Sequence, residues 1–170
     1  MTVTDNLVRP NDILPNFLEA ELQADRLSDL YSSPPIPVLE IANAEGVRVA
    51  FSSFGKLSAD VAGFCDFEER TLYVNSEDPI IDQLFTIAHE LGHWVMHRHL
   101  FQSDPTKYTA LPRMRRMLTG NRHEIEADAF AEYLLVPKRL LLPIKNAPVA
   151  ELASIFAVSQ ALMEDRLKHV

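Results

Sequence analysis

The five residues HELGH at positions 89–93 carry the side chains best suited to chemistry. On an α-helix, residues four apart lie on one face, a turn from each other. His89 and His93 could therefore offer their imidazole nitrogens to one metal ion, and neutral imidazoles suit zinc. Glu90 lies further round the helix, where it could act as the general base in metal-assisted hydrolysis. The spacing thus predicts a zinc-dependent hydrolase.

The same pattern can also arise by chance on a solvated helix. Here the flanking residues, FTIA before the motif and WV after it, are apolar, so we expect the helix to be largely buried. Two histidines and a glutamate in a buried helix need partners, because burial of unpaired polar groups is unfavourable. Gly92 removes a side chain beside the pair, which would let another backbone come close. These features favour a metal site.

A catalytic zinc takes three protein ligands and leaves a fourth position for water. His99 has the spacing of the third histidine in the long zincin pattern HExxHxxGxxH, but Met96 replaces the glycine that would break the helix. Without that break, His99 would lie about 15 Å along the helix axis from His89, too far to share the ion. His97, one turn beyond His93, is expected to support the site or to pack.

The third ligand can instead come from HEIEADAFAEYLL, residues 123–135, which has a strong helical pattern. Glu124 and Asp128 are four apart beside its apolar stripe. Glu124 could therefore bind the ion while Asp128 accepts the N–H of a ligand histidine and fixes its tautomer. Glu126 is the alternative ligand, and it would face away if Glu124 faced inward. At least one of these acids is expected to be a plain solvent-facing residue.

Hydrolysis also requires a hydrogen-bond donor for the charge that develops on the carbonyl oxygen. Candidates are Tyr108, His123 and an arginine within residues 113–122, although each is more often an ordinary surface residue. Residues 98–122 contain six Lys or Arg and one acid, Asp104. This basic segment could bind an acidic part of a partner, or it could be a solvated loop.

Periodicity and turn residues predict the elements that must position these groups. We expect a helix over residues 16–31, a break at the prolines of 34–37, a short helix ending near Gly46, and three short strands within 47–54, 61–70 and 71–76. The HELGH helix should run to about His99. An irregular loop over 101–121, the helix with Glu124 and two closing helices within 148–168 should follow.

The predicted fold class is α+β, a mainly helical domain with a small three-stranded antiparallel sheet. Because HELGH resembles the zincin motif, we expect a zincin-like domain, with the sheet packed beside the HELGH helix. Residues 1–16 are expected to form a flexible N-terminal arm. Residues 17–170 are expected to form a single domain, with the metal-site core at about 34–143 and the closing helices at 148–168.

Composition argues against several classes of protein. A net charge of −8 on 170 residues disfavours non-specific binding to DNA or to anionic membranes. The closing helices superficially resemble a helix-turn-helix, but the last has as many acids as Lys and Arg, so its apolar residues are better explained as core contacts. A single cysteine, Cys65, with no basic and apolar leader and no membrane-length apolar run, favours a cytoplasmic protein.

Together these motifs resemble the ImmA/IrrE family of metallopeptidases. The matching stretches, within about residues 34–167, are IPVLEIANAEGVRV, AGFCDFEERTLYVNSEDPIIDQLFTIAHELGHWVMH, EIEADAFAEYLLVP and LASIFAVSQALMEDRL. The pattern HExxH alone is weakly specific. Its combination, at this separation, with ExxADxFAxxLLxP is highly specific.

The resemblance implies a gluzincin-like zinc site with ligands His89, His93 and Glu124 and with Glu90 as the catalytic base. It also implies a typical substrate, a helix-turn-helix repressor of the Xre type, whose cleavage induces a mobile element or a stress regulon. Other members act in toxin–antitoxin pairs. Val136 stands where methionine is common, which affects nothing catalytic. No DNA-binding module precedes the domain in this sequence, so any regulator is expected on a separate chain.

We therefore predict a zinc endopeptidase of narrow specificity that cleaves a helix-turn-helix repressor or an antitoxin-like partner. The alternative is a zinc-stabilised regulatory or toxin–antitoxin component that acts by binding a protein, with little peptidase activity. Only the enzyme requires Glu90. Neither prediction involves direct contact with nucleic acid or with a membrane.

Overall fold

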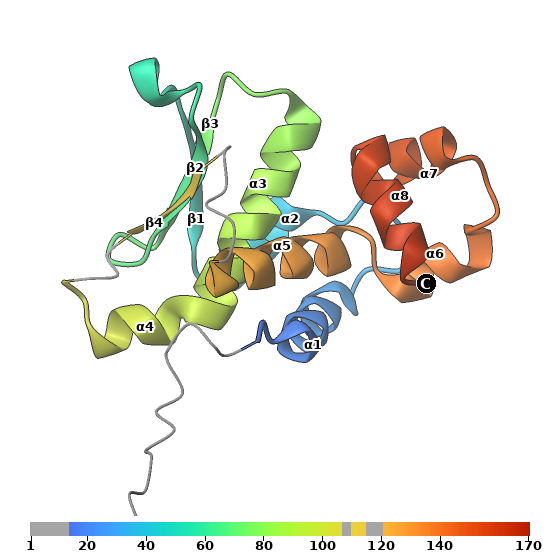
Figure 1. Cartoon of the computed structure of the whole chain (residues 1–170), viewed down its shortest axis with the longest axis horizontal. Coiled ribbons are helices and arrows are strands. Elements are labelled where there is room, and N and C mark those ends of the chain that lie inside the picture. Colours follow the sequence, from blue (N-terminus) through green and yellow to red (C-terminus); the bar gives the residue numbers. More distant parts are fainter. Residues whose placement is uncertain (1–13, 107–109, 115–120) are drawn as a thin grey trace, which may run out of the picture.

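The computed structural model describes residues 14–106, 110–114 and 121–170, and Figure 1 shows how their elements are arranged. The helices are α1 (Phe17–Ser28), α2 (Val38–Ala44), α3 (Ile80–Gly92), α4 (Arg98–Ser103), α5 (Arg122–Leu135), α6 (Lys138–Leu141), α7 (Val149–Phe156) and α8 (Gln160–Lys168). The strands are β1 (Arg48–Ser52), β2 (Val61–Asp66), β3 (Thr71–Asn75) and β4 (Ala110–Met114). Short 3-10 turns cover Gly55–Leu57 and Leu142–Ile144, and a π turn, η2 (His93–His97), joins α3 to α4.

The predicted α+β class is confirmed, with the three expected strands in place. The sheet, however, has the order β1-β3-β2-β4 and is mixed, because β1 runs parallel to β3 while β2 is antiparallel to both β3 and β4. The prediction of an antiparallel sheet was therefore wrong for β1. The connection over residues 53–60 contains a 3-10 turn and carries the chain past β3 to its other edge, where a tight hairpin would have placed β2 beside β1. The prediction also missed β4, which lies in the stretch expected to be a loop.

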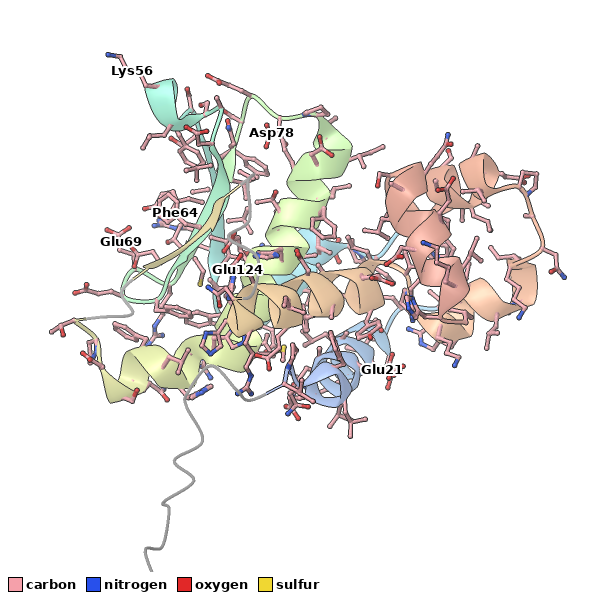
Figure 2. All side chains as sticks on the ribbon, viewed as in Figure 1. Glu21, Lys56, Phe64, Glu69, Asp78 and Glu124 are labelled. Atoms are coloured by element: carbon pink, nitrogen blue, oxygen red, sulfur yellow. The ribbon has the colours of Figure 1, made fainter. Side chains whose placement is uncertain are left out.

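Most helices in Figure 1 lie on one side of the sheet, whereas α4 lies below its lower end. Helix α3 packs against β2 and β3, α5 crosses α3, and α1 packs along α5. Figure 2 shows Phe64 and Glu69 on the face of the sheet turned away from α3, and Glu124 where α5 meets α3. The start of α5 therefore lies against the middle of the molecule, beside the HELGH motif.

Helix α1 is where the sequence predicted a helix, but of its three leucines only Leu27 lies on its buried face. Leu18 is 77% exposed and Leu22 is 60% exposed. The buried side consists of Ala20, Ala24 and Leu27. Small residues allow two helix backbones to approach closely, and here they form the contact of α1 with α5.

The closing helices serve the core, as predicted. Leu152 and Phe156 of α7 are fully buried. Ser159 caps α8 by accepting a hydrogen bond from the Leu162 amide. Arg166 of α8 is also buried and donates from Nε to the carbonyl of Val136 at the end of α5, 3.0 Å away. A basic side chain of the last helix is thus used inside the fold.

Two predictions stay untested. The expected arm at residues 1–16 lies mostly outside the described residues, so its flexibility stays a prediction, as does a single domain over residues 17–170. Among the described residues, no helix combines the length and the apolar character needed to span a bilayer.

Candidate metal centre

Helices α3 and α5 supply the candidate site, and a glycine sets their spacing. A Cβ atom added to Gly92 would lie 2.9 Å from Cδ1 of Phe130 and 3.2 Å from Cα of Ala127, both on α5. Only a residue without a side chain allows the two helices to approach this closely. The contact brings the first turn of α5 beside the histidines of α3.

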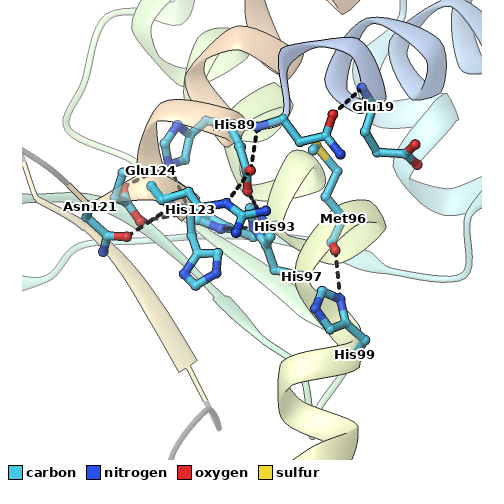
Figure 3. A network of polar contacts seen from close by, with 12 residues as sticks. Glu19, His89, His93, Met96, His97, His99, Asn121, His123 and Glu124 are labelled. Atoms are coloured by element: carbon cyan, nitrogen blue, oxygen red, sulfur yellow. Dashed lines mark hydrogen bonds and ion pairs between the residues drawn. The ribbon is translucent and has the colours of Figure 1, made fainter. Parts of the chain in front are cut away.

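His89, His93 and Glu124 converge at this contact (Figure 3). The Nε2 atoms of the two histidines are 3.1 Å apart. Glu124 places one carboxylate oxygen 3.2 Å from Nε2 of His89 and the other 3.0 Å from Nε2 of His93. Ligands of a tetrahedral zinc lie roughly 3.3 Å apart when the zinc–nitrogen distances are about 2.0–2.1 Å. The donor atoms and their spacing therefore fit a zinc ion, and the cluster could hold a metal.

The environment of the cluster affects the pKa of each of its side chains. Burial lowers the pKa of His93, which keeps this imidazole neutral. Burial acts in the same direction on His89, but hydrogen bonds to Asp128 and Glu124 outweigh it and raise the pKa of His89 to about 9. Burial would raise the pKa of Glu124, yet its hydrogen bonds with His89 and His93 hold that pKa below the usual range. A metal ion bound here would thus displace a proton from His89.

Asp128 lies one turn after Glu124 and contacts the outer side of His89. Its carboxylate oxygen is 2.8 Å from Nδ1 of His89. A carboxylate accepts, so Nδ1 carries the proton and Nε2 presents its lone pair to the cluster. The sequence had predicted this arrangement for a ligand histidine.

Glu90 is fully buried between α3 and the sheet. One of its carboxylate oxygens is 3.6 Å from the position that a Cβ of Gly63 would occupy on β2. That Cβ would also lie 2.5 Å from Cγ2 of Thr86 on α3, so the glycine permits the close packing of α3 on the sheet. The negative charge of Glu90 contributes to the raised pKa of His89, which it follows directly in the chain.

Glu126, the alternative ligand, does not join the cluster. One of its oxygens is 2.9 Å from Nε2 of His97, and the other accepts from Nε of Arg122 at 2.8 Å. His97 in turn places Nδ1 2.9 Å from Nδ1 of His93. The structure therefore brings Glu124 to the two histidines and Glu126 to His97.

The other candidates lie around this centre or outside the described residues. His99 is exposed and contacts the carbonyl of Met96, away from the cluster. His123 packs edge-on against His97 with ring centroids 4.8 Å apart, so it lies beside the centre, on the His97 side. Tyr108 lies outside the described residues, as do Lys107, Arg115 and Arg116 of the basic segment. Of that segment, Arg98 stacks on Trp94 and Arg122 pairs with Glu126.

Sequence reasoning missed the connection from His93 through His97 to Glu126. The four-residue spacings of His93 with His97 and of Arg122 with Glu126 were the only signals that could have indicated it. The π turn, which aligns the first pair, has no sequence signature that we can identify.

Comparisons with known proteins match the part of the chain that contains the candidate metal centre. A family model for the IrrE N-terminal-like domain, Peptidase M78, matches residues 42–168. An uncharacterised immunity region protein of Bacillus phage phi105 is 29% identical over 92 residues, which is 53% of this chain and 54% of that protein. A Mycobacterium tuberculosis transcriptional regulator has a similar fold, with a TM-score of 0.61 at 16% identity over 87% of this chain and 46% of that one.

The chain thus spans about half the length of these two proteins. The family match, in contrast, includes both the HELGH helix and the helix that carries Glu124. The Peptidase M78 family suggests a metallopeptidase, in keeping with the donor set of the cluster. The chain therefore belongs to the IrrE N-terminal-like (Peptidase M78) family, as its resemblance to ImmA/IrrE proteins indicated.

Proposed function

We propose that this protein is a zinc-dependent endopeptidase that cleaves a helix-turn-helix repressor of the Xre type or an antitoxin-like partner. His89, His93 and Glu124 would hold the zinc ion, and Glu90 would be the catalytic base. The observation that carries this proposal is the convergence of the two histidine Nε2 atoms and the Glu124 carboxylate, with contacts of 3.0–3.2 Å between each pair of residues, next to a buried glutamate.

A zinc ion bound there would polarise the scissile carbonyl and make water a better nucleophile. Glu90 would take a proton from the attacking water and deliver it to the amide nitrogen as the C–N bond breaks. Asp128 would hold His89 with Nδ1 protonated throughout. Tyr108 and His123 stay candidates for the donor to the developing oxyanion.

Family membership and one relative support the choice of substrate. The resemblance to ImmA/IrrE proteins implies repressor cleavage, and the phage phi105 relative is described as an immunity region protein. The basic segment over residues 98–122, in a chain of net charge −8, would suit an acidic part of such a partner. The roles in stress response or in toxin–antitoxin pairs stay predictions.

A second candidate is a zinc-stabilised regulator that acts by binding its partner. A relative named for an immunity region is compatible with either candidate. The two differ at Glu90, because a protein that only binds has no need of a general base.

The test combines zinc analysis with a cleavage assay on the full chain. Wild type, Glu90→Gln, Glu124→Gln and the exposed control Glu40→Gln would be measured for bound zinc and for cleavage of the Xre-type repressor encoded nearest to this gene. An Asp165→Asn variant would remove adventitious zinc at a second group of possible ligands, Glu132, Asp165 and His169, which is only partly buried.

We expect one zinc per chain in wild type and in the Glu90→Gln, Glu40→Gln and Asp165→Asn variants. Of these four proteins, only Glu90→Gln should fail to cleave the repressor. Glu124→Gln should bind zinc weakly and should not cleave. If Glu90→Gln still relieves repression by this repressor without cleaving it, the protein acts by binding. If wild type holds no zinc, the proposed metal site is wrong.

A further inference from the structure

The outer nitrogen of His93 faces another histidine, whereas that of His89 faces a carboxylate. Nδ1 of His93 is 2.9 Å from Nδ1 of His97 (Figure 3). Both residues belong to the π turn η2, in which the backbone hydrogen bonds span five residues. Such a turn winds more slowly than an α-helix, so it brings residues four apart more nearly into line. The turn therefore stacks His97 directly behind His93.

The contacts continue from His97 to Glu126. Nε2 of His97 is 2.9 Å from one carboxylate oxygen of Glu126. The other oxygen accepts from the backbone N–H of Asn16 at 2.7 Å and from Nε of Arg122 at 2.8 Å. The side chains of His97 and Glu126 are each only 3% exposed. Water therefore has little access to these contacts, and their donors and acceptors must match one another.

Only one assignment of protons satisfies the contacts that run from Glu126 through His97 to Nδ1 of His93. A carboxylate that accepts from an arginine and a backbone amide is ionised, so it also accepts from His97. His97 must then carry its proton on Nε2 and accept at Nδ1. His93 must therefore donate from its own Nδ1, which leaves the lone pair of its Nε2 directed at the cluster.

From this geometry we propose that His97 and Glu126 are positioning residues, which fix the tautomer and orientation of His93 for metal binding. The inference rests on the proposed metal site and adds to it. Asn16 and Arg122 belong to the same device, because they hold the carboxylate of Glu126 in place. The start of α1 and the first turn of α5 would thus contribute to metal affinity without touching the ion.

Zinc affinity provides the first test, with competition against a chromophoric chelator as the readout. In Glu126→Gln, the amide oxygen would stay with Arg122 and Asn16, so the amide NH2 would face His97. His97 would then accept at Nε2 and donate from Nδ1, which would leave His93 with its proton on Nε2, the metal-binding atom. We expect affinity to fall about 10–100-fold, the usual range for such outer partners. Glu40→Gln, the same change at an exposed site, should have no effect.

A double variant tests whether Glu126 acts through His97. His97→Phe keeps a buried ring without its nitrogens and should also weaken zinc binding. In the His97→Phe background, Glu126→Gln should produce little further loss. Two independent, additive losses would contradict the proposal, because they would show that Glu126 acts by another route.

A direct measurement on the wild-type protein needs no variant to fold. Histidine ¹⁵N–¹H long-range correlation spectra of the zinc-loaded chain report which nitrogen of His97 carries the proton. We expect the Nε2–H tautomer. An Nδ1–H tautomer for His97, or unchanged zinc affinity in Glu126→Gln, would overturn this inference while leaving the metal site intact. Absence of zinc binding in wild type would instead overturn the proposed function.

Discussion

The two histidines of the metal centre are supported in different ways. His89 contacts Asp128 directly, and the side chain of Asp128 is 36% exposed. The outer nitrogen of His93, Nδ1, reaches a carboxylate through His97, and that carboxylate, Glu126, is nearly fully buried. Water can replace a partner near the surface, but it cannot easily replace one in the interior. We therefore expect that removing the carboxylate of Asp128 and removing that of Glu126 will weaken metal binding by different amounts.

The largest effect should come from the ligand that both histidines share. Glu124→Gln removes the charge that lies 3.2 Å from His89 and 3.0 Å from His93. Zinc affinity should fall by well over the roughly 100-fold that marks the loss of an outer partner. Chelator competition measures it. A loss no greater than that of Glu126→Gln would show that Glu124 is not a ligand.

Asp128→Asn tests the comparison itself. The amide can turn its NH2 toward Nδ1 of His89 and favour the wrong tautomer, but water can also reach this half-exposed position. We expect a loss of zinc affinity near the lower end of the range of about 10–100-fold, with Glu126→Gln nearer the upper end. The same titration, run on both variants, measures the order. The reverse order would mean that burial does not decide how strongly each support acts.

Gly92→Ala should weaken both supports together. The new methyl group would press on Phe130 and Ala127 and move α5, which carries Glu124, Glu126 and Asp128. We expect a loss of unfolding free energy of about 1–3 kcal/mol, as for other overpacked contacts, and weaker zinc binding. Denaturant unfolding measures the first quantity. Phe130→Leu in the same chain should recover part of the loss, and strict additivity of the two changes would contradict a direct contact.

The smallest effect should come from Arg122→Met. Arg122 is 34% exposed, and its ion pair with Glu126 links residues four apart on one helix. Such pairs contribute about 0–1 kcal/mol, and Glu126 would keep its contacts with the Asn16 amide and His97. Zinc affinity should fall less than about fivefold. A fall as large as that in Glu126→Gln would assign the main role to the arginine.

Much of the candidate site could be predicted because helical spacing determines which residues share a face. The four-residue interval of His89 and His93 placed both on one side of α3, and that of Glu124 and Asp128 placed a carboxylate at each side of His89. A supporting role for His97 was among the predictions, but its contact with Glu126 could not be predicted, because it depends on how α5 packs against the π turn. Its alignment of His93 with His97 is a property of backbone hydrogen bonds, which the residue types of HWVMH do not reveal.

Parts of the fold could likewise be predicted from the sequence, and other parts could not. Strand positions followed from runs of Val, Phe and Tyr, and the fold class followed from the order of elements. The parallel pairing of β1 with β3 depends on how the connection over residues 53–60 crosses the sheet, which local propensity does not determine. In α1, helical spacing was detectable, but Ala20 and Ala24 lie on the buried side while Leu18 and Leu22 are exposed, because small side chains allow α5 to approach closely.

Helix α1 has one further consequence, for the exchange of parts between relatives. It ends before residue 42, where the match to the family begins, yet it packs against α5, and the amide of its N-cap residue, Asn16, donates to Glu126. A recombination that joined residues 42–168 of this chain to another protein's N-terminal segment would keep His89, His93 and Glu124. It would lose the hydrogen bond from the Asn16 amide to Glu126. The region that matches the family model is therefore shorter than the region whose contacts surround the candidate metal centre, and engineered chimaeras should be joined before Asn16.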